Sequence, residues 1–154
     1  MGKAPCKLLQ REVQGHRILT LENGGMRVSI DVDHGAHLFE LADTESQLNV
    51  LYEDPAGLDY AVGGWYELFP NAGSECRYEG VEVPAHGDIQ HVPWQFRVES
   101  DRPDEIQVRL WTESRVRPFA IEKTVVMRQG QSVLFVKEKI ANTSGRDEPY
   151  LWGQ

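Results

Sequence analysis

The segment around His86 places an imidazole in a stiff bend of the chain. His86 follows Pro84 and precedes Gly87; the proline restricts the backbone, and the glycine allows a ligand to approach closely. An imidazole held in this way can give or take a proton close to neutral pH, which makes His86 a candidate catalytic residue. The alternative is a turn histidine that bonds only to the backbone. His91 has no such surroundings, and we expect it on the surface, with Asp88 capping the turn.

Residues 63–73, with the sequence GGWYELFPNAG, gather aromatic side chains around one carboxylate and one amide. Aromatic rings suit the C–H face of a sugar, while the hydroxyl groups of the sugar need fixed donors and acceptors. Glu67 and Asn71 are therefore candidate substrate-binding residues. The other interpretation is a buried loop that closes one end of the fold. Charged strand residues usually face water and a tryptophan at a strand end usually lies in the core. Arg77, Arg117, Glu122 and Trp152 are further candidates for the wall of a pocket. The alternative is that the three charged residues face water and that Trp152 belongs to the core.

Side chains that bind transition metals gather between residues 31 and 40; they are Asp31, Asp33, His34, His37 and Glu40. Their spacing argues against a shared site, because side chains alternate along a strand and would place His34 and His37 on opposite faces. Residues 33–36 also favour a turn. A metal-binding β-barrel would need two histidines one residue apart followed by a glutamate, a pattern that the chain lacks. We therefore predict no metal site.

Apolar and polar residues mostly alternate from His16 onward, which is the period of half-buried β-strands. A hairpin turn is expected at residues 23–25, Asn-Gly-Gly, because these residues tolerate a positive φ, with a strand on either side. Residues 54–66 are expected to form a long loop. The remaining segments expected as strands are His37–Leu41, Gln47–Tyr52, Trp94–Glu99, Glu105–Glu113, Phe119–Arg128 and Ser132–Asn142.

Short polar connections join the last four of these strands, which predicts an antiparallel meander. A sheet with one apolar face needs a second layer to cover it, so the fold class is all-β, an antiparallel β-sandwich. The chain has no repeat, low-complexity tract or linker, and we expect a single domain, residues 1–154. Residues 150–152 resemble the middle or the exit of a strand, and a strand that stopped there would leave an exposed apolar edge.

Composition excludes several classes of partner. Sixteen basic and 24 acidic residues give a formal net charge of −8, which repels phosphate backbones and anionic lipid. No apolar run is long enough to cross a membrane, and the N-terminus has no apolar signal core. We therefore expect a cytoplasmic protein with no nucleic-acid or membrane partner. Cys6 and Cys76 match no metal or redox spacing and are expected to be free thiols.

Several short segments follow one another along the chain in a specific order: residues 21–28 (LENGGMRV), 33–36 (DHGA), 49–52 (NVLY), 68–73 (LFPNAG), 85–88 (AHGD) with 93–94 (PW), 118–124 (PFAIEKT), 141–144 (ANTS) and 148–153 (EPYLWG). Each segment alone is common, but their order and spacing together resemble the aldose 1-epimerase (galactose mutarotase-like) family. The similarity runs from about residue 18 to the end of the chain.

This resemblance implies a large antiparallel β-sandwich, the mutarotase-like supersandwich, that binds a hexose or related sugar in an open cleft without a cofactor. The family interconverts sugar anomers by acid–base chemistry: a carboxylate takes the proton of the anomeric hydroxyl while an imidazolium protonates the ring oxygen, and the ring opens and closes again. Since the His-Gly loop of the family matches His86-Gly87, the resemblance assigns His86 to the ring-oxygen side, with Asn71 and Glu67 as partners of hydroxyl groups.

The chain departs from the family in length and in one binding residue. Family members are much longer, and their glutamate base and a second histidine lie in a part that has no counterpart here. We therefore expect the N-terminal half of a mutarotase-like domain, truncated or completed by a missing C-terminal half, and a poor catalyst alone. Ala72 follows Asn71 where well-known mutarotases have an arginine, which leaves the sugar open. A different hypothesis is a non-catalytic carbohydrate-binding or structural sandwich, in which a homo-oligomer would hide the open edge.

Overall fold

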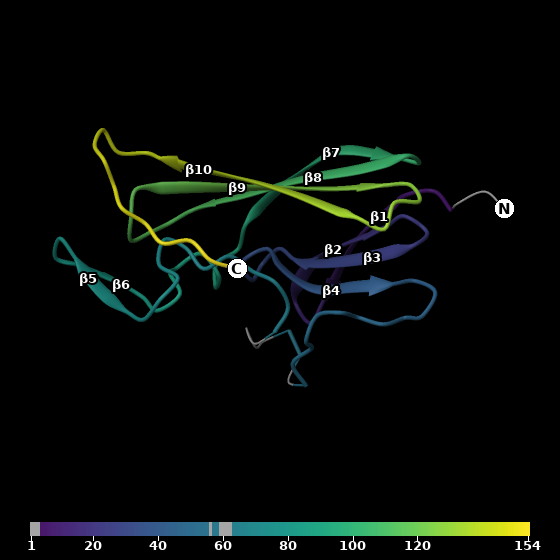
Figure 1. Ribbon diagram of the computed structural model, residues 1–154, viewed down its shortest axis with the longest axis horizontal. Coiled ribbons are helices and arrows are strands. Elements are labelled where there is room, and N and C mark those ends of the chain that lie inside the picture. The colour runs from purple at the N-terminus through teal and green to yellow at the C-terminus, as the bar shows by residue number, and fades with distance from the viewer. Residues whose placement is uncertain (1–3, 56, 59–62) are drawn as a thin grey trace.

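Two antiparallel sheets lie one above the other in the computed structural model, which describes residues 4–55, 57–58 and 63–154 (Figure 1). The first sheet consists, in spatial order, of β1 (Lys7–Val13), β2 (His16–Glu22), β3 (Met26–Asp31) and β4 (His37–Asp43). The second consists of β10 (Leu134–Asn142), β9 (Phe119–Arg128), β8 (Glu105–Glu113) and β7 (Gln95–Arg102). A small hairpin, β5 (Cys76–Tyr78) and β6 (Val81–Val83), projects from one end of the sandwich (Figure 1). The all-β sandwich expected from the alternating pattern is confirmed.

The core lies between the two sheets. Every second residue of β8 and β9 is buried, because successive side chains on a strand point to opposite faces. These residues pack against Leu19, Leu21, Val28 and Ile30 of the first sheet, and each fully buried aliphatic side chain contributes roughly 1.5–3 kcal/mol. Among the residues that the structure describes, no helix is long and apolar enough to cross a membrane.

The hairpin turn predicted at residues 23–25 is confirmed, since β2 ends at Glu22 and β3 begins at Met26. Asn23 also joins the two sheets. Its side-chain oxygen accepts hydrogen bonds from the backbone N–H groups of Gly25 (3.1 Å) and Met26 (2.9 Å). Its side-chain nitrogen donates to the carbonyl groups of Arg128 and Gln131 at 2.9 and 2.7 Å. The turn therefore fixes the end of the second sheet as well as its own hairpin.

The strand predicted at Gln47–Tyr52 is wrong. This segment follows the turn at residues 44–46 and is irregular, with a single bridge between Ala42 and Asn49. The reason is the Asn49 side chain, whose oxygen accepts from the N–H groups of Leu41 (2.9 Å) and Leu51 (3.1 Å). An asparagine that bonds to the backbone in this way competes with a regular strand ladder.

Both cysteines are free thiols, as expected. Cys6 is buried in the core and Cys76 is exposed on β5. Burial, followed by the charges of Asp104 and Glu105, raises the pKa of the Cys6 thiol. Since the thiolate is the reactive form, Cys6 acts as a small core residue.

Candidate functional site

A lysine and a glutamate lie on the apolar inner face of the second sheet. The alternation of β9 turns Lys123 inward between Ile121 and Val125, which are both buried. The register of the sheet sets Glu138 of β10 directly opposite Lys123, on the same face. Ionisable groups on such a face are costly unless they are paired. This position is therefore a candidate site.

Glu67, from the long connection between β4 and β5, completes the group. Lys123 Nζ lies 2.6 Å from Glu67 Oε2 and donates a hydrogen bond to the Ala36 carbonyl at 3.2 Å. Glu67 and Lys123 are each only 1% exposed, and the ammonium group lies 5.5 Å from the centre of the Trp94 ring. The ion pair and the ring contact offset the cost of removing both charges from water. We call Glu67, Lys123 and Glu138 the Glu–Lys–Glu cluster.

The cluster holds a proton on Glu138 at neutral pH. Burial, followed by the hydrogen bond and charge of Glu67, raises the pKa of Glu138 to about 8, against the opposing effects of Lys123 and Gln154. Within the described part of the chain, neither Glu67 Oε1 nor Glu138 Oε2 has a hydrogen-bond partner. Two carboxylates cannot donate to each other, whereas one protonated carboxyl group can. The proton thus gives the pair a hydrogen bond and relieves the repulsion between two like charges.

A hollow of about 400 Å³ opens beside Glu138. We call it the tryptophan hollow; its lining residues are Trp65, Leu134, Val136, Glu138, Trp152 and Gln154. A second hollow of about 500 Å³ shares Trp65 and Gln154 with it and is otherwise lined by Gly63, Gly64, Tyr66 and Leu68.

The tryptophan hollow combines aromatic surface with unused polar groups. Trp152 is 47% exposed, and the Trp65 indole N–H is buried without a hydrogen-bond partner among the described residues. Gln154 Nε2 donates to Glu138 Oε1 at 3.2 Å. Aromatic faces with a few fixed donors and acceptors are the features that hold a small polyhydroxylated ligand.

The backbone of residues 67–71 runs between two other segments of the chain. On one side, Leu68 and Gly153 exchange two backbone hydrogen bonds of 2.9 and 3.1 Å. On the other side, Phe69 forms a bridge with Gly87. Neighbouring strands lie about 4.8 Å apart, so the backbone near Trp152 and the backbone of the His86 loop are separated by about 10 Å.

His86 lies on the surface of its loop. Its side chain is exposed, its φ is +63°, and its N–H donates to the Gly73 carbonyl at 2.9 Å. The side chain lines neither of the two hollows. Gly87 is required at the next position, because its φ is +83° and a Cβ there would lie 1.9 Å from the Phe69 carbonyl oxygen. The Gly87 backbone therefore packs directly against Phe69, and a proton-transfer role for His86 stays a prediction.

Asn71 is buried and fully engaged with backbone groups. Its side-chain nitrogen donates to the carbonyls of Ser74 (2.7 Å) and Pro84 (3.0 Å), and its oxygen accepts from the Gly73 N–H at 3.0 Å. Both amide hydrogens are thereby used. Asn71 joins the loop after Pro70 to the segment that leads into His86, and its contact with a sugar stays a prediction.

Arg77 lies on the projecting β5–β6 hairpin and pairs with Glu82 at 2.8 Å. Its side chain is 67% exposed. Like His86, Arg77 lines neither hollow. Of the residues singled out in the sequence, the structure brings Glu67 and Trp152 to the two sides of Glu138, whereas Arg77 is at a different place on the surface.

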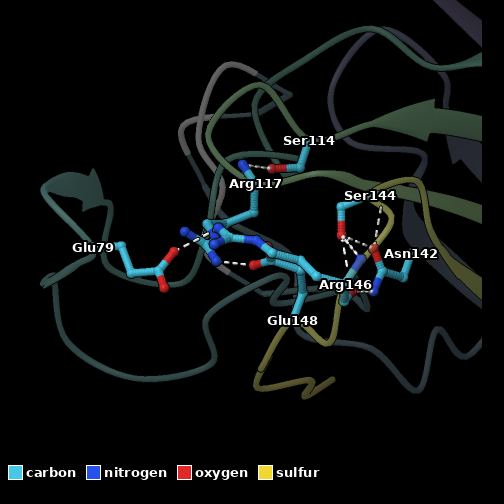
Figure 2. A network of polar contacts seen from close by, with 7 residues as sticks. All are labelled: Glu79, Ser114, Arg117, Asn142, Ser144, Arg146 and Glu148. Atoms are coloured by element: carbon cyan, nitrogen blue, oxygen red, sulfur yellow. Dashed lines mark hydrogen bonds and ion pairs between the residues drawn. The ribbon is translucent and has the colours of Figure 1, made fainter.

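Figure 2 shows that Arg117 belongs to a polar network of its own. Its side chain is 6% exposed and contacts Glu148, which is 1% exposed, and its guanidinium lies 4.5 Å from the centre of the Tyr78 ring. Arg146 bonds to Glu148 at 2.7 Å and to Glu79 at 2.6 Å (Figure 2). The network fastens the β5–β6 hairpin to the chain that follows β10. Arg117 also lines, together with Asn71, a hollow of about 200 Å³, and a contact of either residue with a ligand stays a prediction.

Glu122 pairs with Arg109 at 3.3 Å on the face of β9 opposite to Lys123. Both residues line a separate hollow of about 400 Å³, and a contact of Glu122 with a ligand stays a prediction. A hollow of about 380 Å³ is lined in part by Gly57 and Leu58, which flank residues outside the described ranges, and we assign no site there. Within the described ranges, no group of three or more His, Cys, Asp or Glu residues is arranged to hold a metal ion.

Sequence reasoning missed Lys123 and Glu138. The signal was present, because each replaces an aliphatic residue in an inward-facing row: Phe119, Ile121, Lys123, Val125 and Met127 in β9, and Leu134, Val136, Glu138 and Ile140 in β10. A charged residue in such a row marks a buried polar group. The partner Glu67 comes from a loop, and its approach depends on the tertiary structure.

The fold and the cluster together define a two-layered β-sandwich with a buried acid–base group beside an aromatic hollow. A scan of family models and a search of curated proteins gave no match for the chain. Among solved structures, the chain is similar to the 1.80 Å crystal structure of a galactose mutarotase-like protein from Clostridium acetobutylicum. The TM-score is 0.59 at 15% identity, over 79% of this chain and 45% of that one. The likeness supports a galactose mutarotase-like fold, and the chain spans less than half the length of that structure.

Proposed function

We propose that the protein binds a monosaccharide or a sugar derivative in the tryptophan hollow. The observation that carries the proposal is the presence of Trp65, Trp152, Glu138 and Gln154 around one hollow of about 400 Å³. The indole rings offer faces to the C–H groups of a pyranose, and the carboxyl and amide groups match its hydroxyls. The volume also falls in the range of small-molecule sites.

The catalytic form of this proposal is aldose 1-epimerase-like interconversion of sugar anomers, with His86 giving a proton to the ring oxygen. The galactose mutarotase-like fold and the match of the His86-Gly87 loop support it. The backbone of that loop and the backbone that carries Trp152 are separated in space by about 10 Å. Catalysis therefore requires a sugar that extends from the hollow towards His86.

The second candidate function is carbohydrate binding without catalysis. One observation favours it: the exposed His86 side chain does not line the hollow. In this form the hollow retains the sugar, and the anomers exchange at the rate of the buffer.

We also propose that residues 1–154 form one domain, equivalent to the N-terminal half of a mutarotase-like domain. The support is the share of the similar structure that the chain covers, 45%. Its partner would be the other half of such a domain or a second copy of the chain. The two free thiols support a cytoplasmic location.

NMR exchange spectroscopy with galactose and glucose tests both forms of the function. Trp152→Ala should weaken sugar binding at least tenfold with little effect on folding, because the side chain is 47% exposed. His86→Ala should abolish any acceleration of anomer exchange while leaving binding unchanged. Arg102→Ala, at an exposed position of β7 that lines neither hollow, is the matched control. Binding with exchange at the buffer rate in both wild type and His86→Ala would establish the non-catalytic form. Absence of sugar binding would refute the proposal.

A further inference from the structure

We propose that the outer face of the second sheet carries a separate binding site for a neutral pyranose unit, in which Trp111 stacks on the sugar while Glu122 and Lys139 bind two of its hydroxyl groups. The site is the hollow of about 400 Å³ whose lining includes these three residues together with Ala120 and Ala141, and we call it the outer hollow. This inference goes beyond the proposed function, because the outer hollow shares no lining residue with the tryptophan hollow.

The register of the sheet explains why the outer face is hollowed at this place. Ala120 of β9 lies directly opposite Ala141 of β10, and the next outward row along the strands holds Trp111, Glu122 and Lys139, on β8, β9 and β10. Neighbouring rows on one face lie about 7 Å apart along a strand, and β8 and β10 lie about 10 Å apart across β9. Two methyl groups beside three long side chains thus leave a depression with the indole on one side and the ammonium group on the other.

Trp111 is held in place before any ligand binds. The Arg109 guanidinium lies 5.0 Å from the centre of the Trp111 ring, and Arg109 pairs with Glu99 at 3.2 Å and with Glu122 at 3.3 Å. Arg109 and the two alanines lie in opposite directions from Trp111 along the strands. The guanidinium therefore covers one side of the indole and leaves the side towards the alanines for a ligand. A ring that is already fixed loses less entropy when a sugar stacks on it.

Glu122 and Lys139 supply an acceptor and a donor on the same row. They are direct cross-strand neighbours, but Glu122 forms its ion pair with Arg109 through Oε2. Within the described part of the chain, no carboxylate forms an ion pair with Lys139, whose side chain is exposed. A carboxylate accepts a hydrogen bond from one sugar hydroxyl, and an ammonium group donates to the next. Adjacent hydroxyl groups of a pyranose match this pair.

The charges of the lining favour an uncharged ligand. Arg109 and Lys139 are cations and Glu113 and Glu122 are anions, so the formal charges of the described lining residues cancel. For an anion or a cation, the attraction of one pair is offset by the repulsion of the other. A neutral polyhydroxylated ring uses both pairs as donors and acceptors.

Two substitutions test the outer hollow without removing its indole. Lys139→Met deletes the ammonium group at an exposed position and should lower the affinity for a neutral sugar by about fivefold or more. Lys137→Met is the matched control, because Lys137 lies two residues away on the same face of β10 and outside the lining; it should bind as wild type. Ala141→Gln should prevent binding, since its side chain would occupy the space of the ligand.

The experiment titrates the 154-residue chain with methyl β-galactoside and methyl β-glucoside and follows its four indole N–H signals by NMR. The Trp111 signal is assigned by its loss in Trp111→Phe. Titrations of wild type and of Trp152→Ala, which disables the tryptophan hollow, separate the two sites. The inference expects the Trp111 signal to shift in both proteins, with weaker binding in Lys139→Met and unchanged binding in Lys137→Met.

Three results would overturn the inference: a Trp111 signal that does not respond, an equal loss of affinity in the two lysine variants, or tighter binding of glucuronate or tetramethylammonium than of the glycosides at Trp111. Shifts of the Trp65 and Trp152 signals without Trp111 would overturn the inference and leave the proposed function in place. Shifts of Trp111 alone would support the inference and refute binding in the tryptophan hollow.

Discussion

Replacing Glu138 by glutamine should make the stability of the protein less sensitive to pH. In the wild type, burial and the neighbouring Glu67 raise the pKa of Glu138 from its ordinary value of 4.5 to about 8. Below the lower value, the folded and unfolded chains both hold the proton. Between the two values, the unfolded chain releases the proton while the folded chain keeps it, so the free energy of unfolding falls as the pH rises. Above about 8 this contribution levels off.

The size of the effect follows from the difference between the pKa values of Glu138 in the unfolded and the folded chain. Each pH unit within that window costs up to about 1.4 kcal/mol of folding free energy. Between about pH 6 and about pH 8 the wild type should lose roughly 2 kcal/mol through Glu138, and this is an upper limit because solvent reaches part of the side chain. Glutamine keeps both hydrogen bonds and does not titrate, so the variant should not show this loss.

Urea unfolding at about pH 6, 7, 8 and 9 measures the difference directly. The stability of Glu138→Gln relative to wild type should increase across this range and then become constant. The control, Glu122→Gln, removes a carboxylate of the same strand pair on the opposite face and should follow the wild-type slope. Parallel pH profiles for wild type and Glu138→Gln would refute the shared-proton interpretation of the cluster.

Three further substitutions test the packing around the site. Lys123→Met leaves two buried carboxyl groups without their cation. It should lower the free energy of unfolding in urea by about 3–5 kcal/mol near neutral pH and by clearly less near pH 5. An equal loss at both pH values would contradict this. Gly87→Ala puts a Cβ 1.9 Å from the Phe69 carbonyl oxygen at a φ of +83° and should cost about 2–4 kcal/mol by thermal unfolding. Arg117→Gln removes one of the two arginine partners of the buried Glu148 and should cost about 1–3 kcal/mol, with faster amide exchange in the β5–β6 hairpin; unchanged exchange would show that the network does not hold the hairpin.

The second sheet was predictable because its strands obey the alternation rule. The bounds of β8 and β9 agree with the segments expected from the sequence, Glu105–Glu113 and Phe119–Arg128. By contrast, β1 was not predicted, since most of its residues are exposed on both faces and no apolar period marks it. The prediction of a strand at Gln47–Tyr52 was wrong because the hydrophobic period contains no information on hydrogen bonds between a side chain, such as that of Asn49, and the backbone.

The site was predictable only in part. The loop sequence pointed to Glu67 and the end of the chain to Trp152, but neither position reveals that both meet at Glu138. That meeting depends on the register of β10 against β9 and on the bridge between Leu68 and Gly153. These are contacts between segments far apart in the chain, and local pattern does not encode them.

The pairing of Lys123 with Glu138 also selects against misaligned forms of the second sheet. If β10 slipped by one residue along β9, Glu138 would turn outward and Lys137 or Lys139 would face Lys123, so that like charges met in the core. A slip of two residues would restore the face but would set Val136 or Ile140 opposite Lys123 and leave the carboxyl group behind. An all-aliphatic row would tolerate either error far better. The buried charges therefore favour the observed register of β10 against β9 over its neighbouring registers.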